Sequence, residues 1–179
     1  MKSIPQNYTL SNGQTCPIIG IGTSTVGTTE LISDIIYHSI KDGVRLIDTA
    51  SCYGSEEGVG LGISKAIKEG IIKREDLFII TKCDWHDRCK VEEALKESLK
   101  KLNLTYVDLY LDHWPFSFIY DKEGNKANFM PMHKFWVQME KLVKDGLTKN
   151  IGCLPGSGEY LTPNLVPGAL SGGLFFIEI

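Results

Sequence analysis

The feature that most constrains the fold of this chain is a repeated join between an amphipathic segment and an apolar one. The joins read KDG-VRLID, KEG-IIKREDLFIITK and KDG-LTKNIG, and they begin at residues 41, 68 and 144. Each join indicates a helix that ends at a glycine C-cap and is followed by a strand. Because the apolar runs are continuous rather than alternating, they predict a parallel sheet that is covered by helices.

Short apolar runs and helical spacing of apolar residues define the expected elements. The pair Asn12-Gly13 suits a tight turn, so we expect a β-hairpin made of residues 8–10 and 15–17. The expected strands are 17–22, 44–48, 77–82, 106–113 and 147–152, and the expected helices are 28–43, 55–70, 90–104 and 132–146.

The helix that is expected over 55–70 begins with two acids. Glu56 and Glu57 lie in its first turn, where a negative charge complements the helix dipole, so we expect a structural role for them rather than a catalytic one. The apolar side of this helix is expected to carry Val59, Ile63 and Ile67.

Composition excludes several classes of protein. The 179 residues carry a formal net charge of −3, so no basic surface indicates binding to nucleic acid. No stretch approaches the ~20 consecutive apolar residues of a membrane span. The five cysteines are scattered, without a CxxC pair or a Cys/His spacing typical of zinc. We therefore expect reduced thiols, a cytoplasmic location and no bound metal.

Three successive predicted strands end in polar residues. Asp48, Lys82 and His113 close the strands 44–48, 77–82 and 106–113, and Tyr53 lies in the loop after Asp48. Functional groups of βα folds lie at the carboxyl ends of the strands. Taken singly, these residues have structural explanations: a capping acid, a loop aromatic, a lysine that reaches water and a packing histidine. Their shared position at one edge favours a joint function.

The four side chains suit the delivery of a proton to a carbonyl group. A tyrosine has an ordinary pKa near ~10 and donates slowly at neutral pH, unless a neighbouring ammonium favours the phenolate. Lys82 can supply that ammonium, Asp48 can hold it in place, and His113 can orient or polarise the carbonyl oxygen. None of these groups is a reductant, so a hydride must come from a cofactor such as a nicotinamide.

These residues carry a resemblance to the aldo/keto reductases, which are NADPH-dependent (β/α)8 barrels. The family's first signature is matched by GVRLIDTASCYGSEEGVG over 43–60, and its lysine and histidine motifs by ITK and LYLDHWP. The hairpin followed by IGIGT fits as well. The resemblance spans roughly residues 5–152. It implies a partial TIM barrel, made of the N-terminal hairpin and the first four to five βα units.

The resemblance also implies roles for individual residues. Tyr53 would be the proton donor, Lys82 and Asp48 would acidify it, and His113 would bind the substrate carbonyl with Trp114 beside it. The substrate would be a small carbonyl compound.

The family's cofactor implies a second set of residues. NADPH would lie with its nicotinamide and ribose near Gly22, Thr23 and Asp48. A doubly wound dinucleotide-binding fold is the competing interpretation, but GIGTSTVG lacks the G-x-G-x-x-G fingerprint and GVGLG lies inside a helix pattern.

The chain departs from the family pattern at several positions. Ser24 stands where the family usually has tryptophan, and Trp85 lies near a pocket tryptophan of the family. Asp112 replaces an apolar residue; it could raise the pKa of His113, although strand alternation predicts that it faces a partner on the helix side. After Cys153, LPG replaces the Ser-Asn-Phe stretch that holds the nicotinamide carboxamide in the family.

The last segment differs in composition from the rest. Residues 153–179 contain three prolines and five glycines. We therefore expect a barrel part over 1–152 and an irregular tail over 153–179. Because five strands do not close a barrel, the chain is expected to be marginal as a monomer and to bind NADPH poorly. The alternative function is a non-catalytic fragment that binds a full-length relative.

Overall fold

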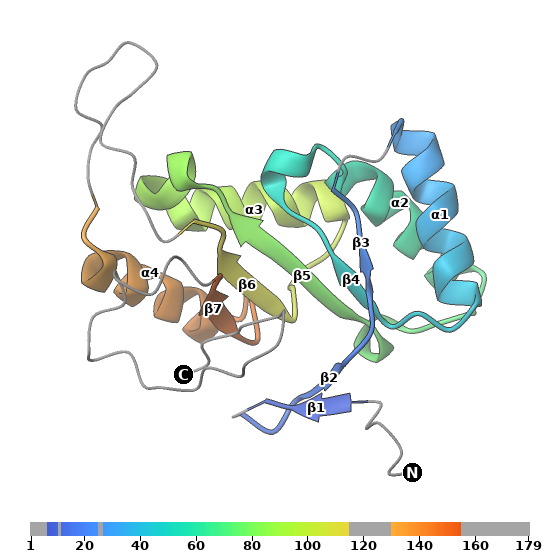
Figure 1. The fold of residues 1–179 in the computed structure, drawn as a ribbon, viewed down its shortest axis with the longest axis horizontal. Helices are drawn as coiled ribbons and strands as arrows, with labels where there is room; N and C mark the ends of the chain where they lie inside the picture. Colours follow the sequence, from blue (N-terminus) through green and yellow to red (C-terminus); the bar gives the residue numbers. More distant parts are fainter. Residues whose placement is uncertain (1–6, 11, 25–26, 115–129, 155–179) are drawn as a thin grey trace.

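The computed structural model describes residues 7–10, 12–24, 27–114 and 130–154 (Figure 1). A β-hairpin comes first, in which β1 (Asn7–Thr9) pairs antiparallel with β2 (Thr15–Pro17). This confirms the predicted hairpin, and Gly13 supplies the positive φ of +84° that its turn requires. The segment 155–179, which includes most of the predicted tail, lies outside the described residues.

Strands and helices alternate after the hairpin. The strands are β3 (Ile21–Gly22), β4 (Leu46–Asp48), β5 (Phe78–Cys83), β6 (Leu109–Asp112) and β7 (Ile151–Cys153). The helices are α1 (Thr29–Lys41), α2 (Glu56–Lys68), α3 (Val91–Leu102) and α4 (Met132–Lys144). Short 3₁₀ turns are η1 (Ser51–Tyr53), η2 (Arg74–Asp76) and η3 (Trp85–Lys90).

The described sheet has the order β3-β4-β5-β6-β7, and every neighbouring pair is parallel. Because consecutive strands are neighbours, each helix returns the chain on the same side, and the helices form one outer layer (Figure 1). The predicted α/β class and its parallel sheet are confirmed.

Side-chain alternation gives the sheet two apolar faces. Ile47, Ile79 and Tyr110 belong to the larger core beneath the helices. Ile80 and Leu111 belong to a second cluster on the inner face, to which the hairpin and its flanks contribute Leu10 and Cys16. Two buried faces explain why the strand sequences are apolar throughout.

Helix α2 packs closely between its neighbours because of its glycines. A Cβ on Gly58 or Gly62 would meet atoms of α1 at 2.7 or 2.6 Å, and a Cβ on Gly60 would lie 2.6 Å from the carbonyl group of Leu102. The glycines of GVGLG therefore serve helix packing. The buried face of α2 includes these glycines and continues to Ala66, which is fully buried.

Two predictions about buried positions were wrong. Ile67 was expected in the core, but it is 36% exposed. The buried face of α2 contains the close-packed glycines and Ala66 instead. Of the run 17–22, which was expected to be one buried strand, Pro17 pairs in the hairpin, only Ile21–Gly22 pair in the parallel sheet, and Ile19 is 82% exposed. Within the described sheet β3 has one neighbour, β4, which explains why the run before it is not enclosed.

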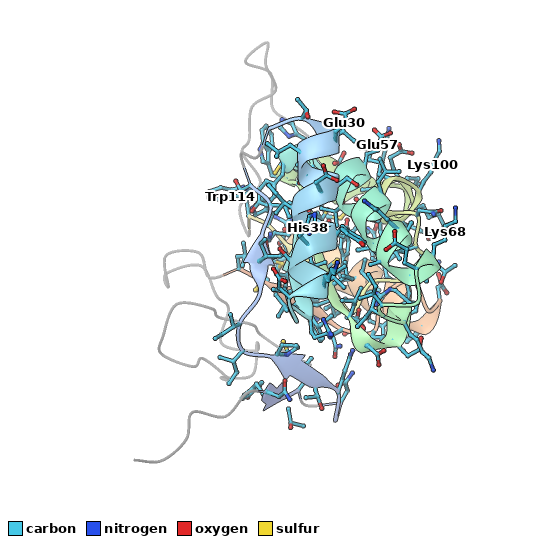
Figure 2. The ribbon with its side chains drawn as sticks, turned by 90° about the vertical axis from the view of Figure 1, so that its right-hand side faces the viewer. Glu30, His38, Glu57, Lys68, Lys100 and Trp114 are labelled. Atoms are coloured by element: carbon cyan, nitrogen blue, oxygen red, sulfur yellow. The ribbon has the colours of Figure 1, made fainter. Side chains whose placement is uncertain are left out.

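The outer layer carries much of the charge that Figure 2 displays. Glu30 and Glu57 lie in the first turns of α1 and α2, at the upper end of the view, and Lys68 lies in the last turn of α2. Trp114 lies on the opposite side of the view from Lys68 and Lys100. No helix within the described ranges is long and apolar enough to cross a membrane.

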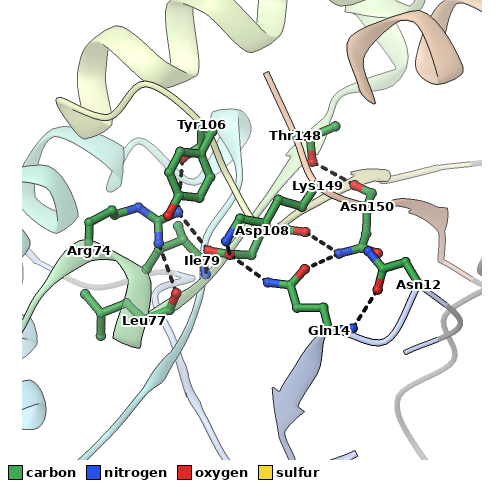
Figure 3. Close-up of polar contacts among 10 residues, drawn as sticks. All are labelled: Asn12, Gln14, Arg74, Leu77, Ile79, Tyr106, Asp108, Thr148, Lys149 and Asn150. Carbon is green, nitrogen blue, oxygen red and sulfur yellow. Dashed lines mark hydrogen bonds and ion pairs between the residues drawn. The ribbon is translucent and has the colours of Figure 1, made fainter. Parts of the chain in front are cut away.

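A polar network fastens the hairpin to the amino-terminal end of the sheet (Figure 3). The buried carboxylate of Asp108 accepts hydrogen bonds from Arg74, Gln14 and Lys149 at 2.7, 2.8 and 2.9 Å. The Gln14 side chain in turn accepts from Asn150 Nδ2 at 2.6 Å. The hairpin is therefore held at the end of the sheet that lies opposite the carboxyl ends of the strands.

Candidate active site

The strand pattern brings three of the predicted residues to one edge. Asp48 ends β4, Lys82 lies two residues after the inward-facing Ile80 on β5, and the backbone N–H of His113 donates to Cys83 just past β6. Alternation therefore places the side chains of these residues on the inner face. We call this edge, with Asp48, Lys82 and His113, the strand-end rim.

Lys82 is the centre of the site. Its side chain is 3% exposed, and its ammonium donates to Asp48 Oδ1 at 2.5 Å, to the backbone carbonyl of Thr49 at 2.9 Å and to Tyr53 Oη at 3.2 Å. An ammonium has three N–H donors, so these acceptors fix its orientation. Because Tyr53 Oη accepts from Lys82, its own hydrogen remains available to another acceptor.

Tyr53 reaches the rim from the turn η1. Gly54 follows in a left-handed conformation with φ +69°, which ends the turn and lets α2 begin. The Tyr53 ring meets the His113 ring edge-on, with 5.6 Å between the centroids. Tyr53 is half-buried and His113 is 9% exposed, so both border solvent at the rim.

The surroundings of His113 favour its neutral form. Burial, together with the nearby Lys82 ammonium, lowers the pKa of His113 from its ordinary 6.5. The idea that Asp112 raises this pKa was wrong, because the two side chains point to opposite faces. Asp112 forms an ion pair with Arg88 at 3.4 Å on the helix side, as strand alternation predicted, and burial raises the pKa of Asp112 to about 7.

Thr23 and Gly22 lie beside Asp48. The N–H and the hydroxyl of Thr23 donate to the Asp48 carbonyl at 3.0 and 3.2 Å, and the hydroxyl also contacts Ser55 Oγ at 2.9 Å. Ser55 Oγ lies 3.0 Å from Thr49 Oγ1, so a buried row of hydroxyls holds the end of β4. Gly22 pairs with Asp48 and is exposed.

The remaining predicted residues lie further from the ammonium. Trp114 is 48% exposed, and its ring centroid is 5.7 Å from that of His113. Ser24 is exposed and Trp85 is half-buried at the start of η3. The structure thus brings Asp48, Tyr53, Lys82 and His113 together, with the other residues around them.

Two contacts of the site escaped the sequence analysis. Cys52 Sγ lies 3.5 Å from His113 Nδ1. Glu56 lies in the first turn of α2 as expected, but it is buried and accepts a hydrogen bond from Thr81 Oγ1 at 2.7 Å. A polar Thr81 on the helix-facing side of an apolar strand was the signal that could have indicated a buried partner.

Fold and site together define a class of protein. The molecule is a βα-repeat protein whose parallel strands bring a carboxylate, an ammonium and an imidazole to one rim, around a phenol whose oxygen accepts a hydrogen bond from the ammonium. Such a set suits general acid catalysis at a polar double bond.

Comparison with known sequences gives the family. A sequence model described as the aldo/keto reductase family matches residues 18–155. The chain therefore belongs to the aldo/keto reductase family, and its five parallel strands and hairpin form part of a (β/α)8 barrel.

Individual relatives agree with this assignment. The chain is 42% identical over 172 residues to the NAD(P)H-dependent D-xylose reductase of Pachysolen tannophilus, covering 87% of this chain and 53% of that protein. It is 38% identical over 156 residues to the 4-dihydromethyl-trisporate dehydrogenase of Mucor mucedo, covering 78% and 48%. The chain spans about half the length of the curated relatives it matches.

A solved structure has the same arrangement of elements. The crystal structure of the Bombyx mori aldo-keto reductase AKR2E4 in complex with NADP superposes with a TM-score of 0.73 at 38% sequence identity. The match covers 82% of this chain and 49% of that one.

Proposed function

We propose that this chain carries the site of an NADPH-dependent reductase that converts aldehydes and ketones to alcohols. The observation that supports the proposal is the contact between Lys82 Nζ and Tyr53 Oη, at 3.2 Å. It leaves the phenol hydrogen free and sets a positive charge beside the oxygen that must lose it. A small carbonyl compound is the proposed partner, and D-xylose is a first probe because several relatives bear that name.

The residues near Gly22 fit a nicotinamide ring. Gly22 is exposed at the rim beside Asp48, and a Cβ built on it would have no atom within 4 Å, so a flat ring can approach the backbone there. Gly22, Thr23 and Asp48 would hold this part of the cofactor. The nicotinamide, when bound, supplies the hydride that carbonyl reduction requires.

The protein's own residues handle the proton. Reduction adds a hydride to the carbonyl carbon and a proton to the oxygen, and Tyr53 Oη gives up that proton. The Lys82 ammonium stabilises the charge left on the phenolic oxygen, because an opposite charge within a few ångströms favours the ionised form. Asp48 keeps the ammonium oriented, since it accepts at 2.5 Å from the other side.

His113 orients the carbonyl oxygen. Because burial and Lys82 lower the pKa of His113 and so favour the neutral imidazole, one ring nitrogen would carry a hydrogen that can be donated to the substrate. Trp114, exposed beside it, would contact the rest of the substrate. A cytoplasmic location remains a prediction from the cysteines.

The test is NADPH oxidation with an aldehyde, measured for the chain and for Tyr53→Phe. We expect Tyr53→Phe to lower kcat by about 10²–10⁴-fold, the usual contribution of a general acid. Tyr8→Phe is the matched control, because Tyr8 is 46% exposed on the hairpin, and it should leave the rate unchanged. Undiminished turnover by Tyr53→Phe would refute the role of Tyr53.

A second candidate function is that of a non-catalytic fragment that binds a full-length relative. The exposure of Ile18 and Ile19, at 46% and 82%, beside the end strand β3 of the described sheet favours it. Mixing the chain with a full-length aldo/keto reductase and measuring complex formation by gel filtration distinguishes the two. Complex formation without NADPH oxidation by the chain alone would favour the fragment.

A further inference from the structure

Each of the three residues of the turn η1 contacts a residue of the candidate active site. Ser51 Oγ donates to the Lys82 carbonyl at 3.3 Å, Cys52 Sγ lies 3.5 Å from His113 Nδ1, and Tyr53 Oη accepts from Lys82 Nζ. This one turn therefore contacts β5 and the end of β6 at the same time. The contact of Cys52 has no part in the function proposed above.

We propose that Cys52 is a positioning residue, whose thiol donates to His113 Nδ1 and thereby keeps the ring hydrogen on Nε2. Its consequence for catalysis rests on the proposed carbonyl reductase function, whereas the state of the imidazole does not. A neutral histidine has one donor nitrogen and one acceptor nitrogen, and the hydrogen bond made by one decides the state of the other.

The direction of the hydrogen bond follows from the two partners. The thiol has one hydrogen to donate and the unprotonated imidazole nitrogen is a good acceptor, so we take the thiol as the donor, although N–H donation from the ring to sulfur is the competing arrangement that the experiment distinguishes. Partial burial raises the pKa of the Cys52 thiol, which therefore keeps the hydrogen it donates. Burial and Lys82 lower the pKa of His113, which therefore keeps an acceptor nitrogen.

The arrangement has a chemical consequence at the rim. With Nδ1 occupied by the thiol, Nε2–H is the donor that His113 can offer to a carbonyl oxygen. Without the thiol the imidazole hydrogen can lie on either nitrogen. In the molecules that carry it on Nδ1, the unprotonated Nε2 would face the carbonyl oxygen and could not donate a hydrogen bond to it. Cys52 would then act through His113, with no contact to the reacting atoms.

Nitrogen NMR of chain labelled with ¹⁵N-histidine tests the proposal directly. The chain has four histidines, and the His113 signals are assigned by their loss in His113→Gln. In the wild type we expect the neutral Nε2–H form. Cys52→Val, which is somewhat larger and lacks a donor, should give a mixture of both forms, and Cys52→Ser should restore the Nε2–H form.

Two results would overturn the proposal. One is a wild-type His113 that carries its hydrogen on Nδ1, which would mean that the ring donates to sulfur. The other is a Cys52→Val spectrum identical to that of the wild type. Because Cys52 is exposed, we expect the variants to fold, and circular dichroism verifies this before the spectra are compared.

Kinetics separates this proposal from the function on which it rests. We expect Cys52→Val to lower kcat/KM for an aldehyde about two- to tenfold, in line with the loss of one hydrogen bond, and Cys52→Ser to stay within about twofold of the wild type. Absence of turnover in the wild type would refute the reductase function, while the NMR result would still decide the positioning. Turnover with an unchanged imidazole state in Cys52→Val would refute the positioning alone.

Discussion

The Nζ atom of Lys82 lies 3.2 Å from the phenolic oxygen of Tyr53, across 29 positions of sequence. The strand β5 holds one partner and the turn after β4 holds the other, so their distance depends on the pairing of the two strands. Asp48 closes the arrangement from the end of β4. Because the Lys82 side chain is buried, the ion pair of Lys82 and Asp48 is sensitive to the removal of either charge. The two removals are not equivalent.

Asp48→Asn should destabilise the fold more than Lys82→Met. Lys82 is 3% exposed and Asp48 is 29% exposed. Loss of the carboxylate leaves a buried ammonium among neutral acceptors, and we expect a loss of about 3 kcal/mol in the free energy of unfolding. Loss of the ammonium leaves a carboxylate that water reaches, so the loss should be smaller. Urea unfolding measures both variants, and the reverse order would contradict this interpretation of the site.

Asp112 should make stability depend on pH. Burial raises its pKa from 3.8 to about 7, opposed by the charge of Arg88. Between these values the folded chain holds a proton that the unfolded chain has released, so the free energy of unfolding should fall as the pH rises from about 4 to about 7.

The variant Asp112→Asn isolates this contribution. Asparagine does not titrate, so the difference between the wild-type and variant free energies of unfolding should change across that pH range and level off below it. The slope can reach about 1.4 kcal/mol per pH unit. Urea titrations at a series of pH values supply the curve, and a pH-independent difference would show that Asp112 ionises normally in the fold.

Gly60→Ala should destabilise the chain although alanine favours helices. A Cβ at this position would lie 2.6 Å from the backbone carbonyl groups of Leu102 and Lys101, so α2 and α3 must separate. We expect a loss of about 1–3 kcal/mol, the usual cost of overpacking, seen as a lower Tm. Leu61→Ala is the control, because Leu61 is 51% exposed on the same helix, and its effect should be small. A higher Tm for Gly60→Ala would mean that the helices adjust freely.

Asp108→Asn should reduce stability without reducing the reductase rate proposed for this chain. The variant removes the charge that faces Arg74 and Lys149, and its amide presents a donor to other donors (Figure 3). We expect a loss of about 3–5 kcal/mol in the free energy of unfolding. Asp42→Asn, at an exposed position, should change it by less than about 0.5 kcal/mol. A lower kcat of Asp108→Asn, measured at a temperature far below the Tm of the variant, would contradict this expectation. It would mean that the hairpin end of the sheet affects catalysis at the opposite end.

Much of the fold could be predicted from local sequence. The hairpin, the alternation of strands and helices and the glycine stops follow from short-range patterns, which the backbone obeys wherever the chain lies. Ile67 shows the limit of such patterns. The spacing of Ile67 suits the buried face of a helix. However, α1 and α3 approach α2 closely at Gly62 and Gly60, and the buried face of α2 therefore lies on the side of these glycines and leaves Ile67 exposed.

The sequence by itself determined which residues stand at the ends of the strands, because alternation and strand length are local properties. That is enough to place Asp48, Lys82 and His113 at one rim. Only the tertiary structure decided what these side chains contact: that Cys52 faces His113, that Glu56 is buried against Thr81, and that Asp108 anchors the hairpin. Polar partners far apart in sequence leave no periodic pattern, since hydrogen bonds depend on distances that exist after the strands have paired.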